Sequence, residues 1–431
     1  MARKKNVFVV GLDDFNLEKL KRLPEASECR FLPAVKFSEM RGVEDFSIPD
    51  LLKLTDQRVD QAGYIDAVVS YFDFPGSVLV PIIAEKYDLP GPSLKSVMRC
   101  EHKYCSRKAQ YKVIPDNIPA FQAFDPFDDN AYEKIGFKPP FWIKPIKSYH
   151  SYLAYHIKNK THFNECIKEV REHIDYMSAP FSYIIQTFDM PENIRGNQHM
   201  MFAETPISGH QCTVEGYVFD HEVVMYGVID SITAEKYPSF TRYQYPSSHP
   251  YEVQYRMGDL ARLVIKQIGL NNAAFNIEFF YNEEENKIFL LEVNPRISQS
   301  HSSMFEHIHG ISNHEIMLNL ALGRRPEPLE YKGEHHIAAH FMHRAFNPGV
   351  VSNIADNKTI AGLKKKYPEM ALSINVEKGQ DLDDMEEHHT DSYSYVLADL
   401  DLGAENEEEL LDKYNDIIKQ LEIQVKPKKD K

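Results

Sequence analysis

Glycine is scarce in this chain of 431 residues. It contains 19 glycines, which is about 4% of the chain against about 7% in average proteins. A phosphate-binding loop built on glycines would therefore have to be local. The first candidate, Gly11 followed by Leu12 and Asp13, lacks the second and third glycines that let a dinucleotide pyrophosphate approach the backbone. A dinucleotide site is not supported at this turn.

The five cysteines are odd in number, scattered, and include no Cys-x-x-Cys pair. This spacing indicates neither a disulfide framework nor a thiolate metal site. Long apolar segments are also missing, because no run reaches the ~18 residues of a membrane-spanning helix. The apolar stretch at residues 7–11 is too short for a signal peptide. We therefore expect a cytoplasmic protein with no membrane partner.

Positive charge is in short supply: 49 basic residues face 64 acidic ones, and the formal net charge is −15. Proteins that bind nucleic-acid backbones need a positive footprint, so we expect no nucleic-acid partner. Core material is ample, since 43% of the residues are apolar and 26% are charged, as in an ordinary globular protein. A chain of this length is too long for one hydrophobic core, which predicts two to four domains.

The first hundred residues alternate short apolar runs with polar stretches of helical length. The runs lie at residues 6–11, 30–37 and 67–71. Such alternation predicts parallel strands joined by crossover helices, a doubly wound α/β unit. Beyond this unit, residue patterning predicts helices at 94–111, 161–174, 253–268 and 405–421, and strands at 141–145, 151–157, 182–188, 211–218 and 222–230.

Two apolar segments, residues 274–281 and 287–296, flank a polar turn and predict a β-hairpin. Glu278 and Glu292 lie at equal distances from residue 285. A turn centred there places the two acids close to opposite one another, on the same face of the hairpin. Like charges in that position repel, so the hairpin calls for a compensating positive charge.

Asn294 projects from the same face as Glu292, because side chains alternate along a strand. Carboxylate and amide oxygens are the ligands that Mg²⁺ prefers, together with phosphate oxygens of a substrate. One interpretation is therefore a nucleotide-bound Mg²⁺ site. The alternative is that both acids end in solvent or are neutralised by Lys287 or Arg296.

The order of these motifs resembles that of the ATP-grasp superfamily. A linker segment with Lys103, a Lys-Pro strand with Lys144, and a hairpin ending in Glu292-x-Asn294-Pro295-Arg296 follow an α/β unit. The resemblance covers roughly residues 1–325. It implies a mixed α/β and α+β protein: a doubly wound N-terminal domain, a two-lobed ATP-grasp domain and a strand-rich C-terminal α+β extension. The implied boundaries are 1–95 for the N-terminal domain, 96–190 for the linker helix and first lobe, 191–325 for the second lobe, and 326–431 for the extension.

The resemblance also implies a role for each motif residue. Lys103 and Lys144 would approach the phosphates of ATP. The segment Gln186, Thr187, Phe188 matches the hinge whose backbone pairs with adenine. Arg296 matches the arginine beside the transferring phosphoryl group. The ligands implied for one or two Mg²⁺ ions, which Mn²⁺ could replace, are Glu278, Glu292 and Asn294.

One segment departs from the superfamily pattern. Members usually place a glycine-containing phosphate loop after the Lys-Pro strand, but residues 146–152 contain no glycine. A loop without glycine approaches phosphates less readily, because β-carbons restrict its conformations. Donors would instead come from Lys147, Ser148, His150 or Ser151. A second departure is Gln211 at a position where an acid is usual, which Glu215 could compensate.

The acceptor side carries weaker signals. Residues 298–302 follow Arg296 and would border a carboxylate substrate, or would form a helix-entry loop rich in capping residues. Arg242 could clamp a carboxylate or phosphate, although an exposed loop arginine fits the same pattern. Four histidines between residues 335 and 343 have no cysteine or acid nearby to complete a ligand set, so we do not expect zinc there.

These features predict an ATP-dependent carbon–nitrogen ligase. Mg·ATP would phosphorylate a substrate carboxylate, and an amine would attack the acyl phosphate to leave an amide, ADP and phosphate. One alternative is a carboxylase or carbamoyl-type enzyme with bicarbonate as the phosphoryl acceptor. Another is a nucleotide-binding scaffold with impaired turnover, which would explain the glycine-free loop. The expected partners are a small-molecule carboxylate and an amine, and a homodimer is compatible with such a chain.

Overall fold

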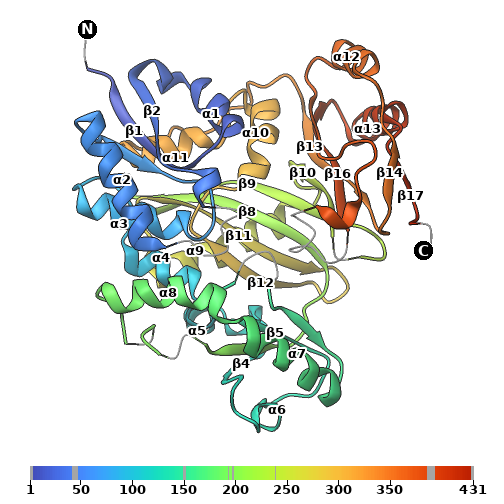
Figure 1. Ribbon diagram of the computed structural model, residues 1–431. Coiled ribbons are helices and arrows are strands. Elements are labelled where there is room, and N and C mark those ends of the chain that lie inside the picture. Colours follow the sequence, from blue (N-terminus) through green and yellow to red (C-terminus); the bar gives the residue numbers. More distant parts are fainter. Residues whose placement is uncertain are drawn as a thin grey trace.

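The computed structural model describes residues 3–40, 47–148, 152–192, 194–196, 199–237, 239–385 and 394–428. Figure 1 shows an N-terminal unit and a C-terminal unit at the two ends of a large central sheet, with a smaller sheet below it. Among the described helices, none is long and apolar enough to cross a membrane.

The N-terminal unit contains a three-stranded parallel sheet in the order β2–β1–β3. Residues 7–10 of the central strand are fully buried, which explains their continuous apolar run. The predicted α/β unit is therefore confirmed. Its elements are β1 (Lys5–Leu12), α1 (Asp14–Lys21), β2 (Cys29–Lys36), α2 (Ile48–Ala62), β3 (Ala67–Val69) and α3 (Gly76–Lys86).

The predicted linker helix is two helices, α4 (Leu94–Glu101) and α5 (Lys103–Val113). The break lies at His102, whose backbone is extended and whose Nδ1 accepts a hydrogen bond from the backbone N–H of Cys105. Burial lowers the pKa of His102 to about 4, so its neutral ring can act as this acceptor. The break makes Lys103 the first residue of α5.

The smaller sheet is antiparallel, in the order β4–β7–β5–β6. It packs with α7 around Phe141, Ile143, Phe163 and Val170. Of the strand predicted at 151–157, residues 155–157 form β6, residues 152–154 are not in a strand, and residue 151 lies outside the described residues. The elements of this region are β4 (Phe121–Phe124), α6 (Ala131–Lys134), β5 (Phe141–Pro145), β6 (Tyr155–Ile157), α7 (Lys160–His173), α8 (Asp175–Thr187) and β7 (Met201–Glu204).

The strand predicted at residues 182–188 is wrong, because this segment belongs to helix α8. Phe181, Ile184 and Ile185 are buried together in the core shared with the N-terminal unit. Their spacing of three and four residues is that of one helix face. The apolar, β-branched character of the segment suggested a strand, but its periodicity is helical.

The large sheet is antiparallel and has eight strands in the order β12–β11–β8–β9–β10–β13–β16–β15. It runs without interruption from the predicted hairpin into the C-terminal extension. The predicted pair at 211–230 and the helix at 253–268 are confirmed. The elements up to α11 are β8 (His210–Phe219), β9 (Glu222–Thr233), β10 (Phe240–Tyr245), α9 (Tyr251–Ile268), β11 (Ala273–Asn282), β12 (Lys287–Asn294), α10 (Ser302–His309) and α11 (His314–Ala321).

The C-terminal extension adds β13, β15 and β16 to the large sheet and forms a separate β14–β17 pair. Helix α13 covers its strands, with Tyr414 stacked on Phe341 at a centroid distance of 4.2 Å. The elements of the extension are β13 (Ile337–Ala345), β14 (Val350–Asn353), α12 (Asn357–Lys366), β15 (Ala371–Ile374), β16 (Tyr395–Ala404), α13 (Glu407–Leu421) and β17 (Gln424–Lys426).

Candidate active site

The two faces of the large sheet differ in chemistry. On β8, Cys212 and Val214 are fully buried in the core that the sheet forms with α9. Alternation along the strand turns Gln211, Thr213 and Glu215 to the opposite face. Their register partners on β11 are Phe280, Glu278 and Asn276. The polar residues of neighbouring strands are thereby gathered on one face.

Glu278 and Glu292 are direct register partners on β11 and β12. Strand β12 contains a bulge between the pair Glu278–Glu292 and the pair Phe279–Leu290, because Leu291 is an extra residue. The bulge shifts the register by one residue and sets the two acids opposite each other. The predicted juxtaposition of the two carboxylates on one face is therefore present.

Lys103, at the start of α5, forms an ion pair with Glu292. Burial acts to raise the pKa of Glu292, but the ammonium of Lys103 outweighs it and holds this pKa below its usual value. Burial and the negative charge of Glu292 raise the pKa of Glu278 to about 7. Lys103 thus compensates the negative charge of Glu292, whereas a negative charge on Glu278 remains electrostatically unfavourable.

The amide of Asn294 completes the donor set. Its Nδ2 donates to Asn276 Oδ1 at 2.8 Å and to Glu278 Oε1 at 3.2 Å, so its oxygen is the group that it can present to a metal. Gln211 Nε2 donates to Glu278 Oε2 at 2.9 Å. Two carboxylates and an amide oxygen fit Mg²⁺ when substrate phosphates supply further ligands. The described residues contain no cluster of three or more His, Cys, Asp or Glu side chains suited to hold a metal by themselves.

Arg296 lies beside this hairpin and is held by Asp73 from the loop after β3. Its Nε and Nη2 contact the two carboxylate oxygens of Asp73 at 2.7 and 2.5 Å. Both residues line a cavity of about 220 Å³ together with Glu278 and residues 298–301. The arginine is therefore oriented toward the acids by a bidentate pair. Asp73 carried no recognisable sequence signal, because its partner is more than two hundred residues away.

Lys144 and Glu204 form a second charged centre, which sequence reasoning found only in part. Lys144 projects from β5 and donates to Glu204 Oε2 at 3.1 Å. Glu204 also contacts Arg107 of α5 at 2.6 Å, and both of these side chains are only 3% exposed. The available signal was an acid that closes the apolar strand β7, the same pattern that marked Glu292.

Several predicted site residues lie elsewhere. Lys147 is buried in an ion pair with Glu101, and Ser151, like His150, lies outside the described residues. Gln186 and Thr187 are exposed on α8 and Phe188 follows its end, so these residues do not lie on the strand that the hinge prediction assumed.

Arg242 belongs to strand β10 instead of a loop, and it points away from the site. Its neighbour Tyr243 lines the cavity near Glu278. Alternation turns the guanidinium of Arg242 to the other face of the sheet, where it pairs with Glu407 at 2.8 Å. The prediction that Arg242 clamps a substrate is therefore not supported by its position.

Glu215 is fully buried on the site face of β8. It accepts hydrogen bonds from the hydroxyl of Tyr226 at 2.6 Å and from the backbone N–H of Ser298 at 3.3 Å, and it contacts His301 Nδ1 at 2.7 Å. Its carboxylate therefore ties the loop after β12 to the sheet. It does not reach toward Lys103 or Lys144 through any of these contacts.

Residues 137–303 match the model of the ATP-grasp domain family. The chain contains an ATP-grasp domain. The match spans the Lys-Pro strand, the acidic hairpin and Arg296, but it does not reach Lys103 and Arg107, which pair with Glu292 and Glu204. A curated relative, the carbamoyl phosphate synthase large chain of Kineococcus radiotolerans, is 32% identical over 112 residues, which cover 26% of this chain and 9% of the relative.

Solved structures share the fold over nearly the whole chain. The L-amino acid ligase from Bacillus licheniformis has a TM-score of 0.72 at 14% identity, covering 99% of this chain and 100% of its own. Biotin carboxylase from Campylobacter jejuni, in a β,γ-ATP complex, has a TM-score of 0.65 at 14% identity. The match covers 98% of this chain and 92% of the carboxylase chain. Carboxyaminoimidazole ribonucleotide synthase from Aspergillus clavatus, complexed with ATP, has a TM-score of 0.65 at 12% identity. The match covers 98% of this chain and 99% of the synthase chain. The ATP-grasp fold thus extends beyond the matched domain.

Proposed function

We infer that the protein is an ATP-dependent carbon–nitrogen ligase that activates a carboxylate as an acyl phosphate and joins it to an amine. The observation that carries this proposal is the register pair of Glu278 and Glu292, with Asn294 on the same face and Arg296 beside it. ATP-grasp neighbours that include an L-amino acid ligase, two of them in complexes with ATP compounds, support the same assignment.

Glu278, Glu292 and Asn294 would hold one or two Mg²⁺ ions, which when bound neutralise phosphate charge and orient the transferring phosphoryl group. Lys103 and Lys144 already pair with carboxylates at this site, and we propose that both ammonium groups turn to the phosphates when ATP binds. Arg296, fixed by Asp73, would stabilise the charge that develops on the phosphoryl and carbonyl oxygens.

The adenine hinge is proposed at the end of β7 in place of α8. Strand β7 pairs with β5, the strand that carries Lys144, and ends at Glu204. The backbone that leaves β7 begins two residues beyond Phe202, the register partner of Lys144, and the N–H of Thr205 donates to the carbonyl of Ala120. A hinge there would bring the base and the phosphates to the same strand pair.

In the proposed reaction, the step that joins the amine to the acyl phosphate needs no nucleophile from the protein. The amine nitrogen forms a bond to the acyl carbon, the bond from that carbon to the phosphate oxygen breaks, and phosphate leaves with the electron pair. The proton of the attacking nitrogen passes to solvent. None of the five cysteines is needed, and all five are buried.

The test is ADP release from ATP with pooled carboxylates and amines, followed by mass spectrometry of the products. Glu292→Gln should lower the rate by at least about 100-fold, because a metal ligand and its charge are lost. Glu284→Gln, an exposed residue in the turn of the same hairpin, is the matched control and should leave the rate unchanged. An unaltered rate in Glu292→Gln would refute the role assigned to Glu292.

A carbamoyl-type or carboxylase activity is the second candidate, favoured by the segment shared with carbamoyl phosphate synthase. It predicts ADP release that depends on bicarbonate and does not require an organic carboxylate. The scaffold hypothesis, suggested by the glycine-free segment 146–152, predicts ATP binding without ADP release from any pool.

A further inference from the structure

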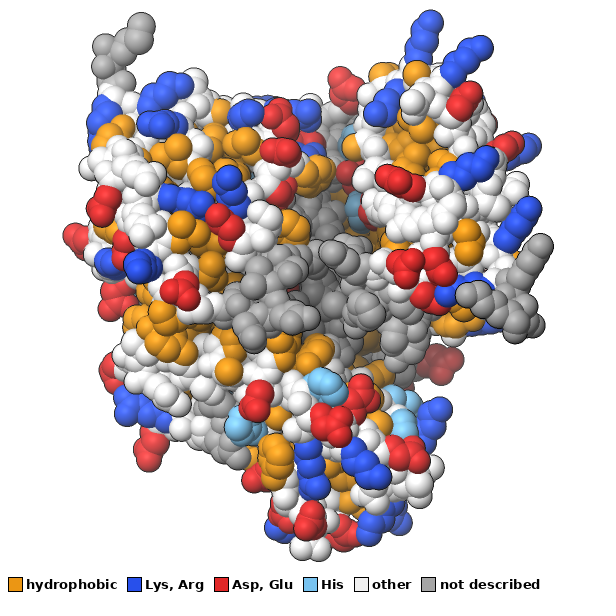
Figure 2. Space-filling model, viewed as in Figure 1, with side chains coloured by type: hydrophobic (Ala, Val, Ile, Leu, Met, Phe, Trp, Pro, Cys, Tyr) orange, Lys and Arg blue, Asp and Glu red, His pale blue; other side chains and the backbone are white. Residues whose placement is uncertain are grey.

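A cavity of about 840 Å³ lies between α1 and the strands of the C-terminal extension. On the face seen in Figure 2, a cleft separates the N-terminal unit from this extension. The cavity shares Phe72, Gln299 and Ser300 with the smaller cavity that contains Glu278 and Arg296. The two cavities are therefore direct neighbours across these three residues, and the larger one lies beside the proposed reaction centre.

The same face of the large sheet lines both spaces. Tyr243 on β10, which borders the cavity at Glu278, is the register partner of His340 on β13, and His340 is the partner of Asp401 on β16. Residues two positions apart on a strand share a face, so Asp399 also projects from it. The C-terminal extension thus continues the wall that begins at the acidic hairpin.

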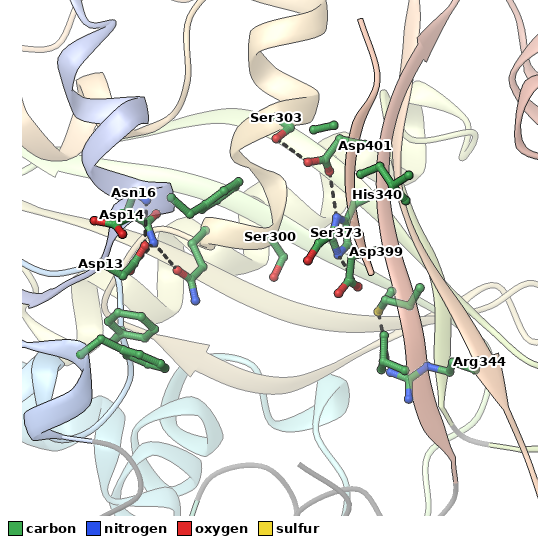
Figure 3. A pocket seen from close by; sticks show the side chains of 18 of the residues that line it. Asp13, Asp14, Asn16, Ser300, Ser303, His340, Arg344, Ser373, Asp399 and Asp401 are labelled. Carbon is green, nitrogen blue, oxygen red and sulfur yellow. Dashed lines mark hydrogen bonds and ion pairs between the residues drawn. The ribbon is translucent and has the colours of Figure 1, made fainter. Parts of the chain in front are cut away.

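Acidic groups dominate the larger cavity. His340 lies between two aspartates, with Nδ1 2.8 Å from Asp401 Oδ1 and Nε2 3.6 Å from Asp399 Oδ1. Figure 3 shows Asp13 and Asp14 of the α1 end across the space from this cluster. The described lining therefore holds four carboxylates against one imidazole and the guanidinium of Arg344.

Burial acts to lower the pKa of His340, but Asp399 and Asp401 outweigh burial and raise this pKa above the usual value. The two aspartates therefore favour the protonated ring of His340, and their other hydrogen-bond partners are neutral. Asp401 is 6% exposed and also accepts a hydrogen bond from Ser303 at 2.8 Å. Lys19, which donates to Ser303, is itself paired with Glu306. Asp399 accepts from the amide of Asn375 at 2.7 Å and keeps about 30% of its side chain exposed at the cavity.

Arg344 is engaged by groups at the edge of the cavity. Its Nε donates to the carbonyl of Phe240 at 2.6 Å and its Nη1 donates to Ser394 at 2.8 Å. Even with Arg344 and a protonated His340 counted as positive, the four carboxylates leave an excess of negative charge in the described lining. A phosphorylated substrate would meet several carboxylates in a space of low dielectric, which is strongly unfavourable.

We propose that this cavity is the acceptor site and that it selects an amine which carries a second positive charge and no phosphate, such as an aliphatic diamine. This assignment rests on the proposed ligase function. The second ammonium pairs with Asp399 and the opposite aspartates, while the reacting amine extends toward Ser300 and the hairpin. Apolar residues in the lining, Phe15, Met342 and Leu372, accommodate the methylene chain.

The test is calorimetric titration of the full chain, without ATP, with three probes: 1,4-diaminobutane, n-butylamine and O-phosphoethanolamine. We expect the diamine to bind at least about tenfold more tightly than butylamine, and phosphoethanolamine not to bind, because only the diamine offers a second cation to the carboxylates. Equal affinities, or tightest binding of phosphoethanolamine, would overturn the proposal.

Asp399→Asn should weaken diamine binding at least about fivefold. Asp412→Asn, an exposed position on α13 of the same extension, should not change it. If Asp399→Asn does not fold, Asp14→Asn, which is exposed on the opposite wall, should weaken binding about twofold or more. Unchanged affinity in a folded variant of either aspartate contradicts the assignment.

Measurements of ADP release distinguish a failure of the ligase proposal from a failure of the cavity assignment. If the diamine binds but supports no ADP release with any carboxylate, the ligase function fails and the cavity assignment stands. If phosphoethanolamine or butylamine supports release better than the diamine does, the ligase function stands and the cavity assignment fails.

Discussion

At the scale of single residues, the buried charged side chains discussed above lie in pairs or triads among the described residues. Arg107 is the clearest case. It is 3% exposed and binds Glu204, and it also donates to the backbone carbonyls of Leu290 and Leu291 at 2.8 and 2.9 Å. One guanidinium therefore connects α5, the end of β7 and the bulge of β12. Its position was not predictable, because its partners come from two distant segments, β7 and β12.

Arg107→Met should destabilise the protein by about 3–5 kcal/mol, because it leaves the Glu204 carboxylate and two backbone carbonyls buried with fewer partners. Chemical denaturation measures the loss. Arg262→Met, at a position 38% exposed on α9 with a partner three residues away, is the control and should cost no more than about 0.5 kcal/mol. A loss below about 1 kcal/mol for Arg107→Met would contradict the structural role.

Glu204 gives stability a defined pH dependence. Burial acts to raise its pKa, but Arg107 and Lys144 outweigh burial and hold the pKa below the ordinary value of 4.5. A depressed carboxyl pKa contributes stability above the unfolded pKa and loses it as pH falls through the folded pKa. The stability gap between the wild type and Glu204→Gln should therefore be constant from about pH 7 to 5 and shrink below about pH 4. Urea unfolding at stepped pH measures it, and a gap that widens in acid would be inconsistent with this linkage.

At the scale of elements, the acidic hairpin depends on two local features. The first is the bulge at Leu291, without which the register through Asn282 and Lys287 would place Leu291 opposite Glu278. The symmetry of the sequence about residue 285 predicted the correct partner, but the bulge that produces it leaves no pattern in the sequence. The second is Gly209, the residue that precedes the neighbouring strand β8.

Gly209 has a φ of +127°, and a Cβ there would lie 2.3 Å from the carbonyl oxygen of Tyr281 at the end of β11. Gly209→Ala should therefore destabilise the protein by about 1–3 kcal/mol. Gly362→Ala is the matched change on helix α12, where nothing lies within 4 Å of the added Cβ, and it should stabilise by about 0.5–1 kcal/mol. Thermal and chemical denaturation of both variants checks the pair, and the same sign for both would refute the argument.

At the scale of the whole molecule, the smaller sheet and the large sheet meet at their charged centres. The enclosed space bordered by Lys103, Lys144, Glu204 and Glu292 is about 20 Å³, which holds about one water molecule. On the proposed ATP site, a triphosphate would require the ion pairs to separate and the two sheets to shift apart. The sheets would then be linked through the ligand instead of through their own side chains.

Mg·ATP at about 100 times its Kd should stabilise the folded protein by about 2.7 kcal/mol, through binding to the native state alone. Removal of the metal with EDTA should abolish most of this gain, because two carboxylates then repel the phosphates. Thermal unfolding with ATP, with and without metal, measures the difference. Glu292→Gln should show a smaller shift than Glu284→Gln, and an equal shift without metal would contradict the metal role.

The sequence by itself determined the parallel N-terminal sheet, the hairpin and the opposition of Glu278 and Glu292, because alternation and buried apolar runs are local patterns. It also indicated the lysines of α5 and β5. It did not determine α8, where β-branched residues obscured a helical period, nor the direction of Arg242, which depends on the face of β10 that it occupies. Only the tertiary structure assigned Asp73 to Arg296 and Arg107 to Glu204, and only it joined the C-terminal extension to the wall of the large cavity. Such pairings form between segments far apart in the chain, so their physical cause is packing, and no local pattern encodes them.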